Sequence, residues 1–144
     1  MRTRFRRSTS KTRLRTAAVL ALACVSAVLS AFLGAEHGYA AGDATKGKSA
    51  FIRECAICHT VEAGGPNRFG PNLFGVLHRK AGAVADFGYS RAFKTTATWD
   101  WNADLVAGWI GAPGVMVPGS AMGVFQGVAQ SDRDDIVAYL ATQQ

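Results

Sequence analysis

Apolar and polar positions along the chain predict several helices separated by long loops. The first predicted helix begins after Asp43, a good N-terminal cap, and runs to about Arg53, with Ala50 and Phe51 on its buried side. Gly47 lies one turn before Phe51, and its missing side chain leaves room for another element to approach closely. We therefore expect this helix to pack against a second one.

The region after this helix is predicted to be irregular. Residues 60–89 are rich in Gly, Pro and Asn and have no sustained apolar period, which is typical of a loop rather than a strand. A short helix is expected to begin at Ser90.

A longer helix is predicted after Asn102. Four apolar residues fall on one helical face: Leu105, Val106, Trp109 and Ile110. Gly111 and Pro113 are expected to end this helix. Residues 114–125, "GVMVPGSAMGVF", then predict a second loop.

The last predicted helix follows Ser131, which would be its N-cap in a capping-box arrangement with Asp134. Its inner stripe consists of Ile136, Val137 and Leu140. No repeat, hairpin or strand pattern is present, so we expect an all-α domain of three to five helices. Long loops bury little apolar area, and a large apolar group at the centre would explain how such a domain folds.

The first 40 residues have the order of parts typical of a secretory signal peptide. Basic residues precede an apolar run from Ala17 to Leu33, and small residues at Gly38 and Ala40 predict cleavage after Ala40, within two residues. An uncleaved membrane anchor is the alternative, since a run of about 17 residues is at the lower limit for spanning a bilayer. We therefore expect a leader over residues 1–40, export to the periplasm, and one domain over residues 41–144.

The net charge of +6 belongs to that leader. Residues 1–40 contain seven basic side chains and one acidic side chain, whereas residues 41–144 contain nine of each. The basic composition therefore does not indicate a nucleic-acid-binding surface, and no nucleic-acid partner is expected.

The stretch "ECAICHT", residues 54–60, has the clearest chemical pattern. Cys24 lies in the leader, so Cys55 and Cys58 are the cysteines of the domain. A zinc site would need further ligands, and a thioredoxin-like pair would need a preceding strand, and both are absent from the pattern. C-x-x-C-H is typical of covalent c-type haem, in which two thiols bond the porphyrin and His59 ligates the iron.

The pattern does not determine the second ligand of the iron. Met116, Met122 and His78 are the candidates within the domain. An open position would allow the iron to bind a gas or peroxide, whereas a strong ligand would restrict it to electron transfer.

The domain also resembles a known family. The stretches "GKSAFIRECAICHTVEAGGPNRFGPNLFGVLHRKAGAVADFGYS", "VPGSAM" and "DRDDIVAYL" resemble class I c-type cytochromes of the mitochondrial and bacterial respiratory or photosynthetic type. The resemblance covers residues 42–143. It implies an all-α cytochrome c fold around one haem c, attached covalently through Cys55 and Cys58.

The resemblance implies roles for residues around the iron. Met122 would be the second axial ligand, and Met116 would lie at the haem edge or the surface. Pro71 would accept a hydrogen bond from Nδ1 of His59 and so orient the ring. Trp109 stands where the family commonly has a tyrosine that hydrogen-bonds near the methionine sulfur.

The resemblance further implies how the haem propionate is held. Its partners would be Arg79, Tyr89 and one tryptophan, for which Trp101 is favoured over Trp99. His78 would be exposed. The contact between the first and last helices would involve Gly47, Phe51, Ile136 and Tyr139.

One departure concerns the surface around the haem edge, where many relatives have lysines. The corresponding positions here are Glu54, Gly114, Ala121 and Val128, with Arg68 as the obvious basic residue and Val115, Met116, Val117 and Gly123 nearby. We therefore expect a largely apolar rim.

The resemblance implies a soluble periplasmic electron-transfer protein, not an enzyme, that carries one electron on a His/Met-ligated haem. The expected donors are a quinol-oxidising complex or a dehydrogenase, and the expected acceptors are a terminal oxidase or a photosynthetic reaction centre. We expect a monomer that acts peripherally at membrane complexes. Two alternatives stay open: a haem subunit of a larger oxidoreductase, and a haem peroxidase or gas-binding protein with an open distal site.

Overall fold

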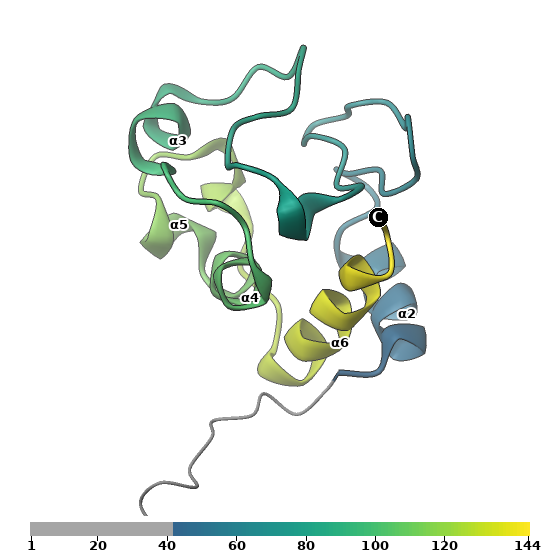
Figure 1. Ribbon diagram of the computed structural model, residues 1–144. Coiled ribbons are helices and arrows are strands. Elements are labelled where there is room, and N and C mark those ends of the chain that lie inside the picture. The colour runs from purple at the N-terminus through teal and green to yellow at the C-terminus, as the bar shows by residue number, and fades with distance from the viewer. Residues whose placement is uncertain (1–41) are drawn as a thin grey trace, which may run out of the picture. The chain divides into compact units, whose positions relative to one another are not determined.

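The computed structural model describes residues 42–144, so the expected leader over residues 1–40 lies outside the described residues. Five α-helices and two 3-10 helices occur in the described part, joined by long loops (Figure 1). They are α2 (Ala44–Glu54), η1 (Val76–His78), α3 (Arg91–Thr96), α4 (Ala103–Gly111), α5 (Pro113–Met116), η2 (Ala121–Val124) and α6 (Gln130–Ala141). The predicted all-α class is confirmed.

Between residues 42 and 144, β pairing is limited to one isolated bridge, which joins Lys80 and Asp100. No helix in this part of the chain is long and apolar enough to cross a membrane.

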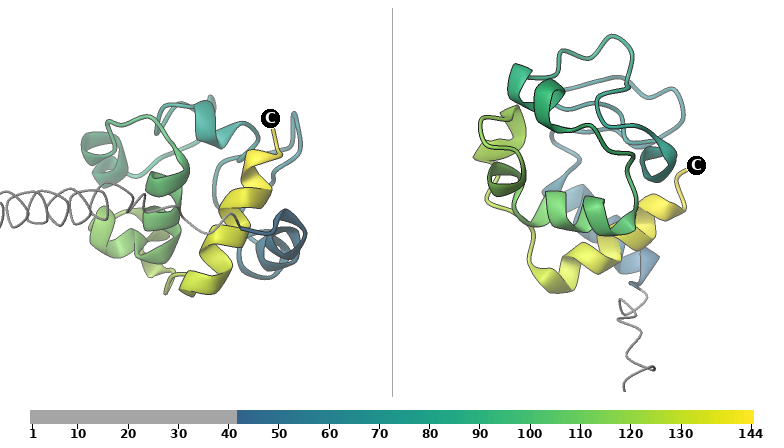
Figure 2. Two further views of the ribbon diagram at one scale, coloured as in Figure 1. Left: turned by 60° about the horizontal axis from the view of Figure 1, so that its bottom comes forward. Right: turned by 60° about the vertical axis from the view of Figure 1, so that its left-hand side comes forward.

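Helices α2 and α6 cross each other at close range (Figure 2). The Asp43 carboxylate caps α2 by accepting hydrogen bonds from the amides of Thr45 and Lys46, as expected from its type and position. A Cβ added at Gly47 would overlap the carbonyl oxygen of Asp135 in α6, so only glycine allows this approach. Phe51 then packs against Tyr139, with ring centroids 5.5 Å apart.

Helices α3 and α4 begin close to their predicted starts, directly after Ser90 and Asn102, and the structure shows that these two residues are N-caps. Ser90 Oγ accepts a hydrogen bond from the amide of Phe93 at 3.2 Å, and Asn102 Oδ1 accepts one from the amide of Leu105 at 2.8 Å. Each bond satisfies an amide of the first helical turn that has no partner within the helix.

The start of α6 differs from the prediction. The helix begins at Gln130 with Ala129 as its N-cap, and no side chain caps it. The predicted capping box of Ser131 and Asp134 is therefore wrong. Val128 donates its amide to the carbonyl of Ile110 at 2.9 Å, and this tertiary bond holds the chain so that the helix starts earlier.

The predicted loop over residues 114–125 is also partly wrong, because it contains most of α5 and all of η2. Pro113 was expected only to end α4, but it is the first residue of α5. Proline suits that position because its missing amide hydrogen would have no partner there. The short helices turn this segment so that its second half, which includes Ser120 and Met122, lines a central cavity.

Candidate functional site

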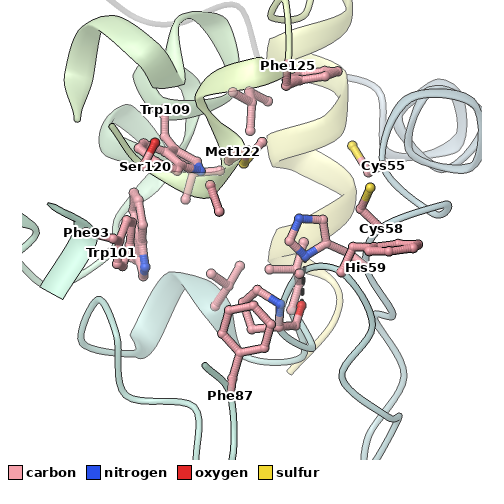
Figure 3. A pocket seen from close by; sticks show the side chains of 18 of the residues that line it. Cys55, Cys58, His59, Phe87, Phe93, Trp101, Trp109, Ser120, Met122 and Phe125 are labelled. Carbon is pink, nitrogen blue, oxygen red and sulfur yellow. Dashed lines mark hydrogen bonds between the residues drawn. The ribbon is translucent and has the colours of Figure 1, made fainter. Parts of the chain in front are cut away.

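The cavity has a volume of about 480 Å³ and mostly apolar walls. This size is in the range of cofactor and ligand sites. Every site residue assigned from the sequence lines it: Cys55, Cys58, His59, Pro71, Arg79, Tyr89, Trp101, Trp109 and Met122. Figure 3 shows the two cysteines and His59 on one side, with Trp101 and Phe93 across from them. The fold thus brings together residues that are up to 67 positions apart in the chain.

The two cysteines and His59 are positioned by the end of α2. Cys55 is the C-cap of this helix, and its amide donates to the carbonyl of Phe51 at 2.8 Å. Its own carbonyl accepts from the amides of Cys58 and His59 at 3.0 and 2.9 Å, which forms a tight turn. Neither thiol is in a disulfide. Burial, with the nearby Glu54 and Cys58 charges, raises the pKa of Cys55 to about 12.

His59 is held by the loop that follows it. Its Nδ1 lies 2.7 Å from the carbonyl oxygen of Pro71, and because a carbonyl only accepts, Nδ1 carries the proton. The other ring nitrogen, Nε2, is therefore left with a free lone pair. Burial lowers the pKa of His59, although the bond to Pro71 acts in the opposite direction, so the neutral ring is favoured.

Three residues were candidates for the second ligand, and they differ in position. Met122, in η2, lines the cavity, whereas Met116 and His78 do not. The His78 side chain is exposed, and Met116 packs on α4, where its sulfur lies 3.9 Å from the Cβ position at Gly108. Met122 is thus the one of the three that faces the same space as His59 (Figure 3).

Arg79 and Tyr89 supply polar atoms to an otherwise apolar wall. The two Nη atoms of Arg79 donate to the carbonyls of Phe74 and Asn72 at 3.0 and 2.8 Å. Within residues 42–144, no carboxylate pairs with this guanidinium. Its pKa is lowered by burial, while the nearby Tyr89 acts in the opposite direction. The half-buried cation is therefore available to an anionic group in the cavity.

Tyr89 has a proton to donate. Its hydroxyl oxygen accepts a hydrogen bond from the amide of Val84 at 3.3 Å, so the O–H remains free for another partner. Burial raises the pKa of Tyr89, against the smaller opposing effects of Val84 and Arg79. Of the two competing tryptophans, Trp101 lines the cavity and Trp99 does not, although Trp99 Nε1 is buried without a partner.

Two further residues of the site were not identified from the sequence. Ser120 lines the cavity, and its buried Oγ has no hydrogen-bond partner. Gly70 packs under the imidazole of His59, where an added Cβ would overlap Cε1. Both adjoin recognised motifs, Ser120 in "PGSAM" and Gly70 directly before Pro71, and that proximity was the available signal.

These residues fit a covalently bound haem. Two unpaired thiols, an imidazole with a free nitrogen and a thioether surround one apolar space, and these are the groups that hold haem in c-type cytochromes. The Ser120 hydroxyl has no hydrogen-bond partner, and no carboxylate of the described residues pairs with the Arg79 guanidinium, so both can bind the carboxylates of such a group.

Comparison with known proteins agrees with this fit. The family model described as Cytochrome c matches residues 44–144. The chain belongs to the cytochrome c family. Relatives named Cytochrome c include those of Cochliobolus lunatus, 38% identical over 104 residues, and Gibberella zeae, 40% identical over 102. The alignments cover 72% and 70% of this chain, and 94% of each relative.

A third relative, the Cytochrome c of Ulva intestinalis, is 39% identical over 100 residues, which is 69% of this chain and 88% of the relative. Cytochromes c are electron carriers and not enzymes, and their cofactor is one haem c bound covalently through cysteines. Cys55 and Cys58 are the two cysteines of the matched region.

The predicted rim of the cytochrome needs a correction. Val117 and Val128 were expected at the surface, but they are only 0% and 6% exposed, because they pack into the core beneath α5 and before α6. Val115, which was expected in the rim, is 82% exposed, and Ile57, Phe69 and Val124 are further exposed apolar side chains, at 75%, 86% and 84%.

Proposed function

We propose that this cytochrome c carries one electron at a time on a haem c whose iron is ligated by His59 and Met122. The observation that carries this proposal is the shared cavity: both residues line it, and a hydrogen bond to Pro71 holds the His59 ring. The haem, when bound, supplies a one-electron couple of iron. A soft thioether from Met122, together with the His59 imidazole, would raise the potential of that couple.

The residues of the chain keep the site unchanged between the two oxidation states. Pro71 and Gly70 fix the His59 ring, one by a hydrogen bond and the other by close packing. Apolar walls that include Phe93, Trp101 and Trp109 exclude water. Because little has to move when charge changes, electron transfer is favoured over ligand exchange.

In this proposal the protein is exported to the periplasm and works there as a monomer. The signal-peptide pattern of residues 1–40 supports export. The donor would be a quinol-oxidising complex or a dehydrogenase, and the acceptor a terminal oxidase or a reaction centre, each met in a brief, weak contact. N-terminal sequencing of the protein from a periplasmic fraction would test the leader, and a start near Ala41 is expected.

A matched pair of methionine variants tests the ligand assignment. Met122→Ala should remove the absorption band that reports iron–sulfur ligation and lower the reduction potential of the purified holoprotein. Met116→Ala should keep both, because Met116 does not line the cavity. The assignment would be wrong if the two variants behaved alike, or if Met116→Ala alone lost the band.

A further inference from the structure

The described part of this cytochrome begins in contact with its last helix, α6 (Figure 1). A Cβ added at Gly42 would overlap the carbonyl oxygen of Asp134 in α6. The amide of Asp43 donates a hydrogen bond to the carboxylate of Asp135 at 2.7 Å. Both residues therefore lie against one turn of α6, and the described chain is packed from Gly42 onward.

The following residues hold this start in place. The Asp43 carboxylate caps α2, and the Asp43 carbonyl accepts a hydrogen bond from the amide of Gly47 at 2.8 Å. Gly47 in turn packs on the carbonyl of Asp135, the residue whose carboxylate binds the amide of Asp43. Pulling Gly42 and Asp43 off α6 would therefore also remove the cap of α2. The start of the domain and the contact between α2 and α6 form one unit.

The expected leader ends directly before this unit. The predicted cleavage site lies between Ala40 and Ala41, so one residue separates it from Gly42. One residue of extended chain spans less than about 4 Å. A peptidase must bind the chain as an extended peptide on both sides of the bond that it cuts, and folded segments are cut only after they open. On one side, that peptide would have to include the packed residues.

We propose that the leader is removed before α2 closes on α6, because the folded junction at Gly42 shields the bond between Ala40 and Ala41. This rests on the export and cleavage proposed above. In the step itself one water is consumed and the peptide bond breaks. The leader then ends in a carboxylate on Ala40, the domain begins with an ammonium group on Ala41, and no electron moves. A leader peptidase at the membrane catalyses this hydrolysis.

The order of cleavage and folding decides the form of the carrier. A chain that is cut first and then folds leaves the membrane, and its first residue is Ala41, directly before the packed Gly42. A chain that folds first keeps the apolar run from Ala17 to Leu33, which is long enough to stay attached to a bilayer. Early folding would therefore convert a diffusing carrier into a tethered one.

Cleavage of the haem-loaded precursor, residues 1–144, tests this order. The precursor is prepared in cells with inhibited leader peptidase, purified in detergent, and checked for folding by circular dichroism. A synthetic peptide of residues 28–50 gives the rate for an unfolded junction, because so short a part of α2 does not form a stable helix alone. Purified leader peptidase should cut the folded precursor at least about tenfold more slowly than the peptide.

A matched pair of insertions locates the shield. Six residues of alternating serine and glycine between Ala41 and Gly42 move the cleavage site away by up to about 20 Å and keep Ala41 after the cut. This variant should be cut within about twofold of the rate of the peptide. The same six residues after Gly64, where a Cβ would meet nothing within 4 Å, leave the junction packed, so that variant should stay protected.

A pair of substitutions tests the packing itself. Gly42→Leu cannot keep the contact with Asp134, so the folded precursor should lose most of its protection. Gly88→Leu should keep it, because a Cβ there meets nothing within 4 Å. Each rate is divided by that of a peptide with the same residue at position 42, so the preference of the peptidase cancels. If Gly42→Leu fails to fold, the insertion at the junction still decides, because it replaces no packed residue.

Equal rates for the folded precursor and the peptide, or continued protection after insertion at the junction, would overturn the proposal. A peptide that is not cut between Ala40 and Ala41 would instead show that the proposed cleavage site is wrong, and this inference would fall with it. Neither result bears on the haem ligands, which the methionine variants test separately.

Discussion

The carbonyl oxygen of Pro71 lies 2.7 Å from Nδ1 of His59, although twelve residues separate them in the chain. The loop between them returns because Gly70 donates its amide to the carbonyl of Cys58 at 2.8 Å. Gly70 then packs under the imidazole. The carbonyl of Pro71 and the backbone of Gly70 thus determine the direction of the His59 side chain. The orientation of the imidazole therefore depends on Gly70, a residue without a side chain.

Substitution of Gly70 by alanine tests this dependence. The added Cβ would overlap Cε1 of His59, so the ring would have to move away from Pro71. We expect the free energy of unfolding to fall by about 1–3 kcal/mol, the range for overpacked sites. The absorption spectrum should also show weakened iron–histidine ligation. Chemical denaturation and spectroscopy of the holoprotein measure both.

Gly88→Ala is the control for this substitution, because a Cβ there meets nothing within 4 Å. Its unfolding free energy should stay within about 0.5 kcal/mol of the native value. If Gly70→Ala were as harmless as Gly88→Ala, the packing of Gly70 on His59 would have no energetic role.

Gly47→Ala should destabilise the contact between α2 and α6. In an exposed helix, alanine would be better than glycine by about 1 kcal/mol, but here the Cβ would overlap the carbonyl oxygen of Asp135. The helices must separate, and we expect a net loss of about 1–3 kcal/mol in urea denaturation. The neighbouring Lys48 is exposed, and Lys48→Ala should change stability by less than about 0.5 kcal/mol. A stabilised Gly47→Ala protein would contradict the close approach.

Arg79→Gln should lower the reduction potential. A nearby positive charge favours the reduced state, which has one positive charge fewer, and the Arg79 guanidinium is half-buried and unpaired by carboxylates in the described region. An effect on the order of 1 kcal/mol corresponds to roughly 40 mV for one electron. Voltammetry measures it. Lys80→Gln removes an exposed cation beside it, and a shift as large as that of Arg79→Gln would show that burial does not matter.

The Asp43 cap should make stability depend on pH in the acid range. Hydrogen bonds from the amides of Lys46 and Thr45 hold the pKa of Asp43 below its ordinary value of 3.8. Because the pKa of Asp43 is lowered in the folded state, the stabilisation from its ionised carboxylate is fully present above pH 3.8. It is lost as the pH falls through the pKa of the folded state. Asp43→Asn keeps a capping oxygen but does not ionise.

Denaturation of the native protein and of Asp43→Asn, from neutral pH into the acid range, measures the difference in their free energies of unfolding. The native protein should lose its advantage over Asp43→Asn only below pH 3.8. An advantage that vanished above that value would contradict the direction of the pKa shift.

Reaction with the native redox partner should depend only weakly on ionic strength. Phe69 and Val124, which line the cavity and are exposed, are apolar, and the side chains of residues 42–144 carry no net charge, whereas salt screens exposed charges over about 10 Å at 0.1 M. We expect the rate of electron transfer to solubilised membranes of the source organism to vary by less than about tenfold from low to high salt. A fall of several orders of magnitude would show that charge steers this cytochrome to its partner.

Much of the fold was predictable because its signals are local. Asp43 caps its helix as expected, and the helices predicted at Ser90 and after Asn102 begin directly after these residues, since a capping bond joins residues two or three positions apart. Ser131 failed in this role because the start of α6 is determined by a bond from Val128 to Ile110, eighteen residues away. Val117 and Val128 were misplaced at the surface for a similar reason, since burial depends on what packs above a residue.

The sequence by itself determined the class of cofactor of this protein, because C-x-x-C-H is a short pattern typical of covalently bound haem. Asp43 and Gly47 likewise predicted a capped helix that packs closely against another. Only the tertiary structure decided which methionine faces His59, that Trp101 rather than Trp99 lines the cavity, and that Phe69 and Val124 surround its opening. The bonds that a side chain can form depend on its residue type, but the direction and exposure of that side chain depend on contacts between segments distant in the chain.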